Sequence, residues 1–586
     1  MAEANTYETV VRDAYLSRLR SVLIIDDEYP TLDGLLQRDC KSNPDYTYKA
    51  PPVEVLEIIR GLRNPSELPP LLVDVHDGRN IKLGEEKEIA EHLHQSDFVV
   101  LDYFLEPDDP SKSIAILKKL ASNNHFNLVL VHSSEDTQKI FETVVQQMLG
   151  KSFPVKFNAT KFEEAKNIVG EERLELLEEN LFSSPGVYLE FRKDPATIKR
   201  RAGRQTPAFK YFDDLVSEAA LDPKLHFDLL AGLLHSYHAE HSDNMSEDDQ
   251  FGPVSFGQID ERRWLKLDTL FVGFTKKSNE KTDLVAEILS ALMAWNPQPP
   301  RLVMRKLVTE LDEHGSKAEN HALSSTHASA YWYRSLLQTP VESRHAQITE
   351  TINHYTESLI SFIQPTLNQM TQSLLAIDNA ANTSQICIER FGVNFENADQ
   401  ESIAIEQHNL IVSNMPEVGD QLHTGTIFDI KQERWICLSA ACDLVPEQGS
   451  PARKRAFGET GIPFLAVKLH KTDRTTAEND ARGKRFIYIK GSKKTEHYCI
   501  NLPESQNSGW NWHKFIATES GRISKDKRIL KVSRIEQADG KLTIQAYNAK
   551  VVGQLRYTYA SALANELGSK LTRIGLDYTQ VARIDS

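Results

Sequence analysis

The chain contains few cysteines, and they are not spaced like metal ligands. Only five occur among its 586 residues: Cys40, Cys387, Cys437, Cys442 and Cys499. An odd, scattered set does not indicate a disulfide framework. Cys437 and Cys442 lie close together in the sequence, but no second pair lies near them to complete a zinc site. We therefore expect reduced thiols, buried as small apolar side chains, and a cytoplasmic location.

Long apolar runs and excess positive charge are also missing. No stretch approaches the roughly 18 consecutive apolar residues of a membrane span. The opening MAEANTYETVVRDAYLSRLR has no apolar signal core, so nothing directs export. The formal net charge of −15 argues against nucleic acid or an anionic membrane as partner. Because no P-loop or nucleophile elbow is found, we do not expect a stand-alone enzyme.

The sequence does contain three short apolar runs that each end in polar residues. They are SVLIIDDEYP (21–30), SDFVVLDYFL (96–105) and FNLVLVHSSED (126–136), and helix-like segments follow the second and third. Fully apolar strands that alternate with helices predict an α/β fold, a doubly wound parallel sheet covered on both faces. Ligands of such sheets bind at the carboxyl ends of the strands. Asp26, Asp27, Asp102 and Ser133 should therefore share one pocket.

Several carboxylates in one pocket repel each other unless a cation lies between them. Oxygen ligands in a compact acidic site suit Mg²⁺, which keeps some of its waters and accepts a phosphate oxygen. An aspartate held beside the cation and a small hydroxyl is then a candidate acceptor that forms an acyl phosphate. The sequence thus predicts a magnesium-dependent phosphoryl site.

These residues resemble the CheY-like receiver domain of two-component response regulators. The resemblance rests on LIIDDE, VVLDYFLEP and LVLVHSSED. It implies that Asp102 accepts a phosphoryl group from a histidine kinase, and that Asp26, Asp27 and the backbone carbonyl of Phe104 help to hold Mg²⁺. Ser133 would take the place of the hydroxyl residue of the family. Phe104 cannot orient a hydrolytic water as a polar side chain can, so we expect a long-lived phosphoryl group.

Receivers also carry a lysine at the end of their last strand, and two candidates are open here. Lys156 has nearly the usual spacing from Ser133, and Phe153 stands three residues before it, where the family places an aromatic residue. Lys193 follows SPGVYLEF, a segment with a stronger strand pattern, but Glu190 then takes the aromatic position. We prefer Lys156 because both the spacing and the aromatic residue agree.

The rest of the chain predicts three further regions. We expect a receiver domain with insertions at 1–200, a helical domain at 201–380, a linker at 381–409 and a β-rich, barrel-like module with a terminal helix at 410–586. An insertion within 38–90 would explain the long spacing between the acidic pair and Asp102.

The whole chain resembles the receiver "buffer" component of Detocs-type anti-phage two-component systems. This resemblance implies a phosphate sink, with a histidine kinase and a second, effector response regulator as partners. A homodimer is a further option, because residues 344–378 form a long amphipathic run. Two alternatives stay open: the C-terminal module is an output enzyme or nucleic-acid binder, or the chain is a pseudo-receiver scaffold that is never phosphorylated.

Overall fold

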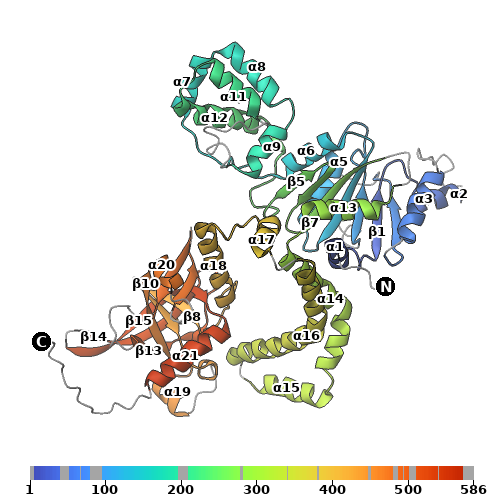
Figure 1. Ribbon diagram of the computed structural model, residues 1–586. Helices are drawn as coiled ribbons and strands as arrows, with labels where there is room; N and C mark the ends of the chain where they lie inside the picture. The colour runs from blue at the N-terminus through green and yellow to red at the C-terminus, as the bar shows by residue number, and fades with distance from the viewer. Residues whose placement is uncertain are drawn as a thin grey trace. The chain divides into compact units, whose positions relative to one another are not determined.

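The chain folds into two compact units. The computed structural model describes residues 6–39, 52–65, 68–78, 96–195, 209–277, 282–339, 341–378, 382–445, 451–479, 486–491, 494–500, 510–538 and 540–571. The first unit comprises residues 1–310 and 366–378, and the second comprises 311–365 and 379–586. The helices and strands of each unit carry the labels of Figure 1.

A seven-stranded sheet forms the centre of the first unit, in the order β2-β1-β3-β4-β7-β6-β5. The strands are β1 (Ser21–Ile25), β2 (Leu72–His76), β3 (Phe98–Leu101), β4 (Asn127–Ser133), β5 (Ser255–Ile259), β6 (Arg262–Lys266) and β7 (Leu270–Lys276). The pairs among β1, β2, β3, β4 and β7 are parallel, whereas β6 and β5 pair antiparallel. Counted along the chain, the parallel strands have the order 2-1-3-4-5, which is a doubly wound arrangement. The predicted fold class is confirmed.

Helices cover both faces of this sheet. They are needed because successive side chains of a strand point to opposite faces, and in β1, β3 and β4 the side chains on both faces are mostly apolar. The covering helices are α1 (Tyr7–Tyr15), α3 (Pro52–Arg63), α5 (Ser111–Ala121), α6 (Thr137–Met148) and α13 (Leu284–Trp295), and α2 (Leu32–Asp39) follows β1 in the chain. Val129 and Val131 pack with α5 and α6 on one face. Leu128 and Leu130, from the same strand, pack with α1, α3 and α13 on the other. We call the second cluster the α13-side core.

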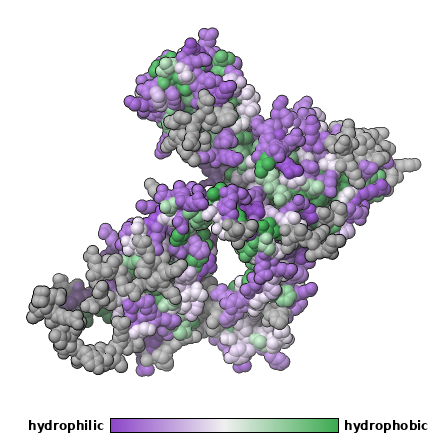
Figure 2. All heavy atoms as spheres, viewed as in Figure 1, coloured by the Kyte–Doolittle hydropathy of each residue, from purple (hydrophilic) through white to green (hydrophobic). Residues whose placement is uncertain are grey.

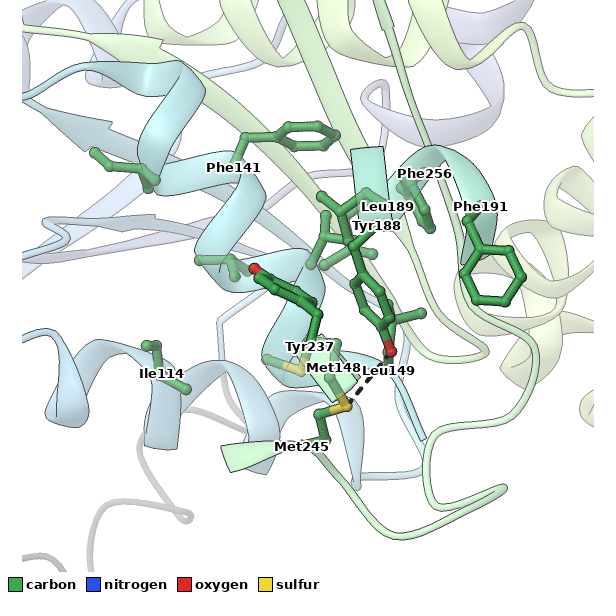
Figure 3. Packing of buried hydrophobic residues seen from close by; sticks show 14 of the residues in the cluster. Ile114, Phe141, Met148, Leu149, Tyr188, Leu189, Phe191, Tyr237, Met245 and Phe256 are labelled. Atoms are coloured by element: carbon green, nitrogen blue, oxygen red, sulfur yellow. Dashed lines mark hydrogen bonds between the residues drawn. The ribbon is translucent and has the colours of Figure 1, made fainter. Parts of the chain in front are cut away.

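Between α6 and β5, the described residues form a set of five α-helices. They are α7 (Ala159–Val169), α8 (Glu171–Leu181), α9 (Gly186–Lys193), α11 (Lys210–Glu218) and α12 (Pro223–His241). Their apolar side chains belong to the same buried cluster as α5 and α6. Figure 3 shows Tyr188 and Tyr237 of this insertion near Met148 of α6. The Tyr188 hydroxyl also hydrogen-bonds His238 Nδ1 at 2.7 Å, which ties α9 to α12.

The expected boundary at residue 200 does not match the edge of a compact unit. Strands β5, β6 and β7 lie between residues 255 and 276, inside the region expected to be helical, and they complete the N-terminal sheet. The reason is that the helical insertion separates β4 from its neighbour β7. The expected insertion within 38–90 falls partly on 40–51 and 79–90, which lie outside the described residues; α3 and β2 occupy much of the remainder.

The second unit contains a closed β-barrel. Its strands are β8 (Thr426–Ile430), β9 (Glu433–Cys437), β10 (Ile462–Thr472), β11 (Phe486–Lys490), β12 (Thr495–Cys499), β13 (Trp512–Ala517), β14 (Ile529–Ala538) and β15 (Lys541–Gln554). Six of them, in the order β10-β13-β14-β15-β8-β9, close through the pairing of β9 with β10, and β12 and β11 extend the sheet from β10. Short helices α19 (Pro451–Phe457) and α20 (Arg474–Asn479) join strands, and α21 (Tyr557–Leu571) packs on the barrel through Leu563 and Leu567. The barrel-like module with its terminal helix is confirmed.

Long helices fill the middle of the chain, as expected. They are α14 (Pro299–Ala322), α15 (Thr326–Gln338) and α16 (Val341–Ile377); α17 (Thr383–Phe391) and α18 (Ala398–Ser413) occupy the segment expected to be a linker. Trp332 Nε1 donates to Thr351 Oγ1 at 2.8 Å and joins α15 to α16. Hydrophilic side chains cover most of the face in Figure 2. Among the helices that the structure describes, none combines the length and apolar character needed to cross a bilayer.

Candidate functional site

Three carboxylates meet at the carboxyl edge of the parallel sheet. Asp26 and Asp27 follow β1, and Asp102 follows β3, its neighbour in the sheet. A carboxylate oxygen from each lies within 4.8 Å of the others. Asp26 and Asp102 are buried, and backbone bonds from Asp26 N to His76 O and from Asp102 N to Ile25 O extend the strand pairing to them. The sequence prediction that these acids converge agrees with this geometry.

A lysine from the other end of the unit already neutralises part of this charge. The Nζ of Lys277 donates to Asp26 Oδ2 and to Asp102 Oδ2, each at 2.8 Å. Lys277 directly follows β7, the fifth parallel strand, and its backbone N–H donates to Ser133 O at 2.7 Å. The end of β7 therefore delivers the cation to the same edge as the carboxylates.

Burial and charge shift the pKa values within the cluster. Desolvation is the main cause that raises the pKa of Asp102 to about 6; Asp26 adds to the rise and Lys277 opposes it. Desolvation disfavours the charged form of Lys277 too, but Asp26 and Asp102 outweigh it and raise the pKa of the ammonium. At neutral pH the site therefore holds a carboxylate that is poorly solvated, which suits a nucleophile.

Ser133 and Phe104 lie at this edge as well. Ser133 ends β4 and is buried, and its Oγ accepts a long bond, 3.5 Å, from Glu135 N. Phe104 stands two residues after Asp102 and is half-buried, with its ring edge-on to Tyr103 at 4.8 Å between centroids. The roles proposed for the Ser133 hydroxyl and for the Phe104 carbonyl stay predictions.

Neither lysine candidate from the sequence reaches the carboxylates. Lys156 lies in residues 150–158, which form no strand of the sheet, and Lys193 is the last residue of helix α9. The prediction of a strand in either segment was wrong, because the spacing of ordinary receivers does not allow for the helical insertion. The signal that could have found Lys277 is LFVGFTKK, an apolar run that ends in lysine, with Phe274 three residues before it. The Phe274 ring is buried and contacts Phe141 of α6 edge-on.

Sequence reasoning also missed a histidine at the site. His132 is the penultimate residue of β4 and is 6% exposed. Burial, and after it the nearby charge of Lys277, lowers its pKa to about 4, so the imidazole is neutral at physiological pH. Its Nε2 is buried and has no hydrogen-bond partner among the described residues. The run LVLVHSSED contains the signal, a single polar ring at a position where a fully buried strand is otherwise apolar.

The donor set fits a small, hard divalent cation. Three aspartates offer oxygen atoms only, and oxygen is the ligand type that Mg²⁺ and Ca²⁺ take in proteins. Asp26, Asp27 and Asp102 would hold the ion, and the cation would offset the negative charge of a phosphoryl group beside Asp102. Lys277 now bonds two of these carboxylates, those of Asp26 and Asp102, and would then share them with the ion.

The N-terminal part of the chain matches a known protein family. Residues 18–177 match the family model of the response receiver domain. The matched segment includes β1 to β4 and ends within α8, before the strand that carries Lys277. Searches of the curated proteins and of the solved structures found no significant match. The chain thus contains a response receiver domain with the CheY-like parallel sheet, and such a domain implies a phosphoacceptor in two-component signalling.

Proposed function

We propose that this chain accepts a phosphoryl group on Asp102 from a partner histidine kinase and acts as a phosphate sink in an anti-phage two-component system. The observation that carries the phosphoacceptor role is the joining of Asp102, Asp26, Asp27 and Lys277 at one edge of a receiver-type sheet. The sink role rests on the resemblance to Detocs-type buffer proteins and on the surroundings of Asp102.

In the transfer, an Asp102 carboxylate oxygen attacks the phosphorus of a phosphohistidine. The new O–P bond forms as the N–P bond breaks, and the bonding electrons return to the ring nitrogen; because the other ring nitrogen of the phosphohistidine carries a proton, the histidine leaves as a neutral imidazole. Lys277 supplies a positive charge where charge develops on the phosphoryl oxygens. Mg²⁺, held by the three aspartates, would supply further charge and help to orient the group.

The loop after Asp102 supports storage of the phosphoryl group. Hydrolysis needs a water molecule directed at the phosphorus, and a polar side chain two residues after the acceptor can orient it. Phe104 occupies that position with a hydrocarbon ring, which packs against Tyr103. A slow loss of phosphate is what a sink requires, because each chain then removes one phosphoryl group from the relay for a long time.

Intact-mass measurement after incubation with acetyl phosphate and Mg²⁺ tests the acceptor. We expect one added phosphoryl group on the wild type and none on Asp102→Asn. Asp108→Asn is the matched control, because Asp108 is an exposed aspartate of the same loop with φ of 58°, a conformation that asparagine tolerates. An unlabelled wild type, or equal labelling of Asp102→Asn, would refute the proposal and favour the pseudo-receiver scaffold.

The sink role needs a second experiment, with the cognate kinase and a second receiver present. Excess wild-type chain should slow phosphorylation of the second receiver, and Asp102→Asn should not. If both proteins slow it equally, the chain acts by binding the kinase rather than by taking its phosphate.

An output role for the C-terminal module is the second candidate, and one observation favours it. A cavity of about 320 Å³ lies between α18, β11 and α21, which is near the lower size limit of small-molecule sites. Tyr488 and Leu563 line it, and among the described lining residues there is no lysine, arginine, histidine, aspartate or glutamate. A neutral ligand that binds the full chain only after phosphorylation of Asp102 would support this alternative.

A further inference from the structure

His132 is a buried polar group without an explanation in the resting site. Its side chain is 6% exposed and its Nε2 has no hydrogen-bond partner among the described residues. A buried nitrogen that lacks a partner destabilises the folded state, so native proteins rarely keep one without a use. An apolar residue would fill this strand position without that cost.

The strand register places His132 beside the acceptor. Leu101 of β3 pairs with Val131 of β4, so the next residues, Asp102 and His132, are neighbours across the two strands. Side chains alternate along a strand, and Val100 and Leu130 both pack into the α13-side core. Asp102 and His132 follow those residues by two positions and thus lie on the same side of the sheet.

Lys277 must cross the end of β4 to reach its partners. In the sheet, β4 lies between β3 and β7, and His132 pairs with Thr275, two residues before Lys277. The ammonium nevertheless bonds Asp102, which directly follows β3, and Asp26, which directly follows β1. The lysine side chain therefore lies over the end of β4, where His132 and Ser133 are.

The bonds of Lys277 change when the site is loaded. An ammonium has three N–H groups, and two of them are used by Asp26 and Asp102. A divalent cation would bind through those same carboxylates, so they would become weaker acceptors for the lysine. The phosphoryl oxygens would then accept from N–H groups that the carboxylates release, and a neutral imidazole nitrogen can accept from a remaining one and keep the ammonium near Asp102.

We propose that His132 is a positioning residue for Lys277: its Nε2 accepts a hydrogen bond from the Lys277 ammonium when a cation and a phosphoryl group occupy the carboxylate cluster. The inference rests on the proposed acceptor role of Asp102. It assigns to β4 a second polar group, besides Ser133, that acts in phosphoryl transfer, and it explains why a buried strand carries an unpaired imidazole.

Three substitutions separate the Nε2 atom from the bulk of the ring. In His132→Gln the side-chain amide lies near the former Nε2, in His132→Asn it lies near the former Nδ1, and His132→Leu keeps the volume without a polar atom. We expect the labelling rate with acetyl phosphate to fall about tenfold in the Asn and Leu variants, the size expected for one lost hydrogen bond to a charged group. His132→Gln should stay close to the wild type.

Binding of beryllium fluoride, a tetrahedral mimic of the phosphoryl group, gives a readout that does not depend on turnover. With Mg²⁺ present, the beryllium fluoride concentration needed to raise the unfolding temperature halfway should follow the same order as the labelling rates. Wild-type values in His132→Leu and His132→Asn would overturn the inference. An equal loss in all three variants would overturn it too, because it would show that only the shape of the ring matters.

The same data keep the two proposals apart. If the wild type is not labelled at all, the acceptor function fails, while the beryllium fluoride series still decides whether Nε2 acts at the cluster. If the wild type is labelled and the three variants do not differ, the acceptor function stands and the role of His132 is refuted.

Discussion

The ammonium nitrogen of Lys277 lies 2.8 Å from Oδ2 of Asp102, although the two residues are 175 positions apart in the chain. This contact joins the first half of a parallel sheet to its last parallel strand. It also means that the carboxylate cluster has its lysine partner only when β7 is in place beside β4.

Substitution of Lys277 by methionine should abolish most phosphoryl transfer. The change removes the positive charge that bonds Asp26 and Asp102, so we expect labelling with acetyl phosphate to fall at least tenfold, the order of effect of a lost charge-stabilising group. Lys156→Met and Lys193→Met are matched controls and should label like the wild type. Full labelling of Lys277→Met, or a loss in Lys156→Met, would contradict the assignment.

Asp102→Asn should stabilise the metal-free protein at neutral pH. The pKa of Asp102 is raised to about 6 by burial, so its ionised form opposes folding above that pH. We expect the substitution to raise the free energy of unfolding by about 1–3 kcal/mol at pH 7.5. The gain should shrink between pH 6 and pH 4, because the wild-type carboxyl group then binds its own proton. Denaturant titrations at pH 7.5 and pH 4.5 measure this, and a gain that is constant with pH would rule out the buried charge of Asp102 as its cause.

Mg²⁺ should raise the unfolding temperature of the wild type, because a ligand that binds only the folded state stabilises it by about 2.7 kcal/mol at one hundred times its Kd. Asp27→Asn should lose most of this effect, since it removes one of the three carboxylates. Asp33→Asn, an exposed aspartate on α2, is the control and should respond like the wild type. A thermal scan with and without Mg²⁺ is sufficient, and an equal response of Asp27→Asn would exclude Asp27 as a ligand.

Phe104→Asn should shorten the lifetime of the phosphorylated state. The amide can orient a water molecule that the phenyl ring cannot, and general acid–base or orienting groups change such rates by about 10²-fold or more. The decay is followed by intact mass after the phosphodonor is removed. Phe153→Asn, which replaces a partly buried phenylalanine of the helical insertion, controls for a general effect of losing a ring. Equal lifetimes of wild type and Phe104→Asn would refute the storage hypothesis.

The parts of this site that the sequence revealed are those defined by short-range patterns. Asp26, Asp27 and Asp102 stand at the ends of apolar runs, so one short stretch of sequence predicts both the strand and the acidic residues at its carboxyl end. Lys277 is different, because its place depends on which strand pairs with β4, and pairing is a tertiary property that the intervening helices conceal. The polar ring of His132 stands out in its apolar run, but its neighbours at the site become visible only in the strand register. The barrel was easier to predict from the sequence, since each of its strands pairs with a strand close in sequence or has alternating apolar and polar residues.

The helical insertion between β4 and β7 also orders events in time. A ribosome adds about 5–20 residues per second, so the lysine at 277 emerges roughly 10–35 seconds after the aspartate at 102. Until then Asp102 lacks the ammonium group that bonds it in the finished sheet. If Asp102 is the phosphoacceptor, as we propose, a chain still under synthesis, or one stalled within the insertion, would therefore accept phosphoryl groups much more slowly than a chain with a finished sheet.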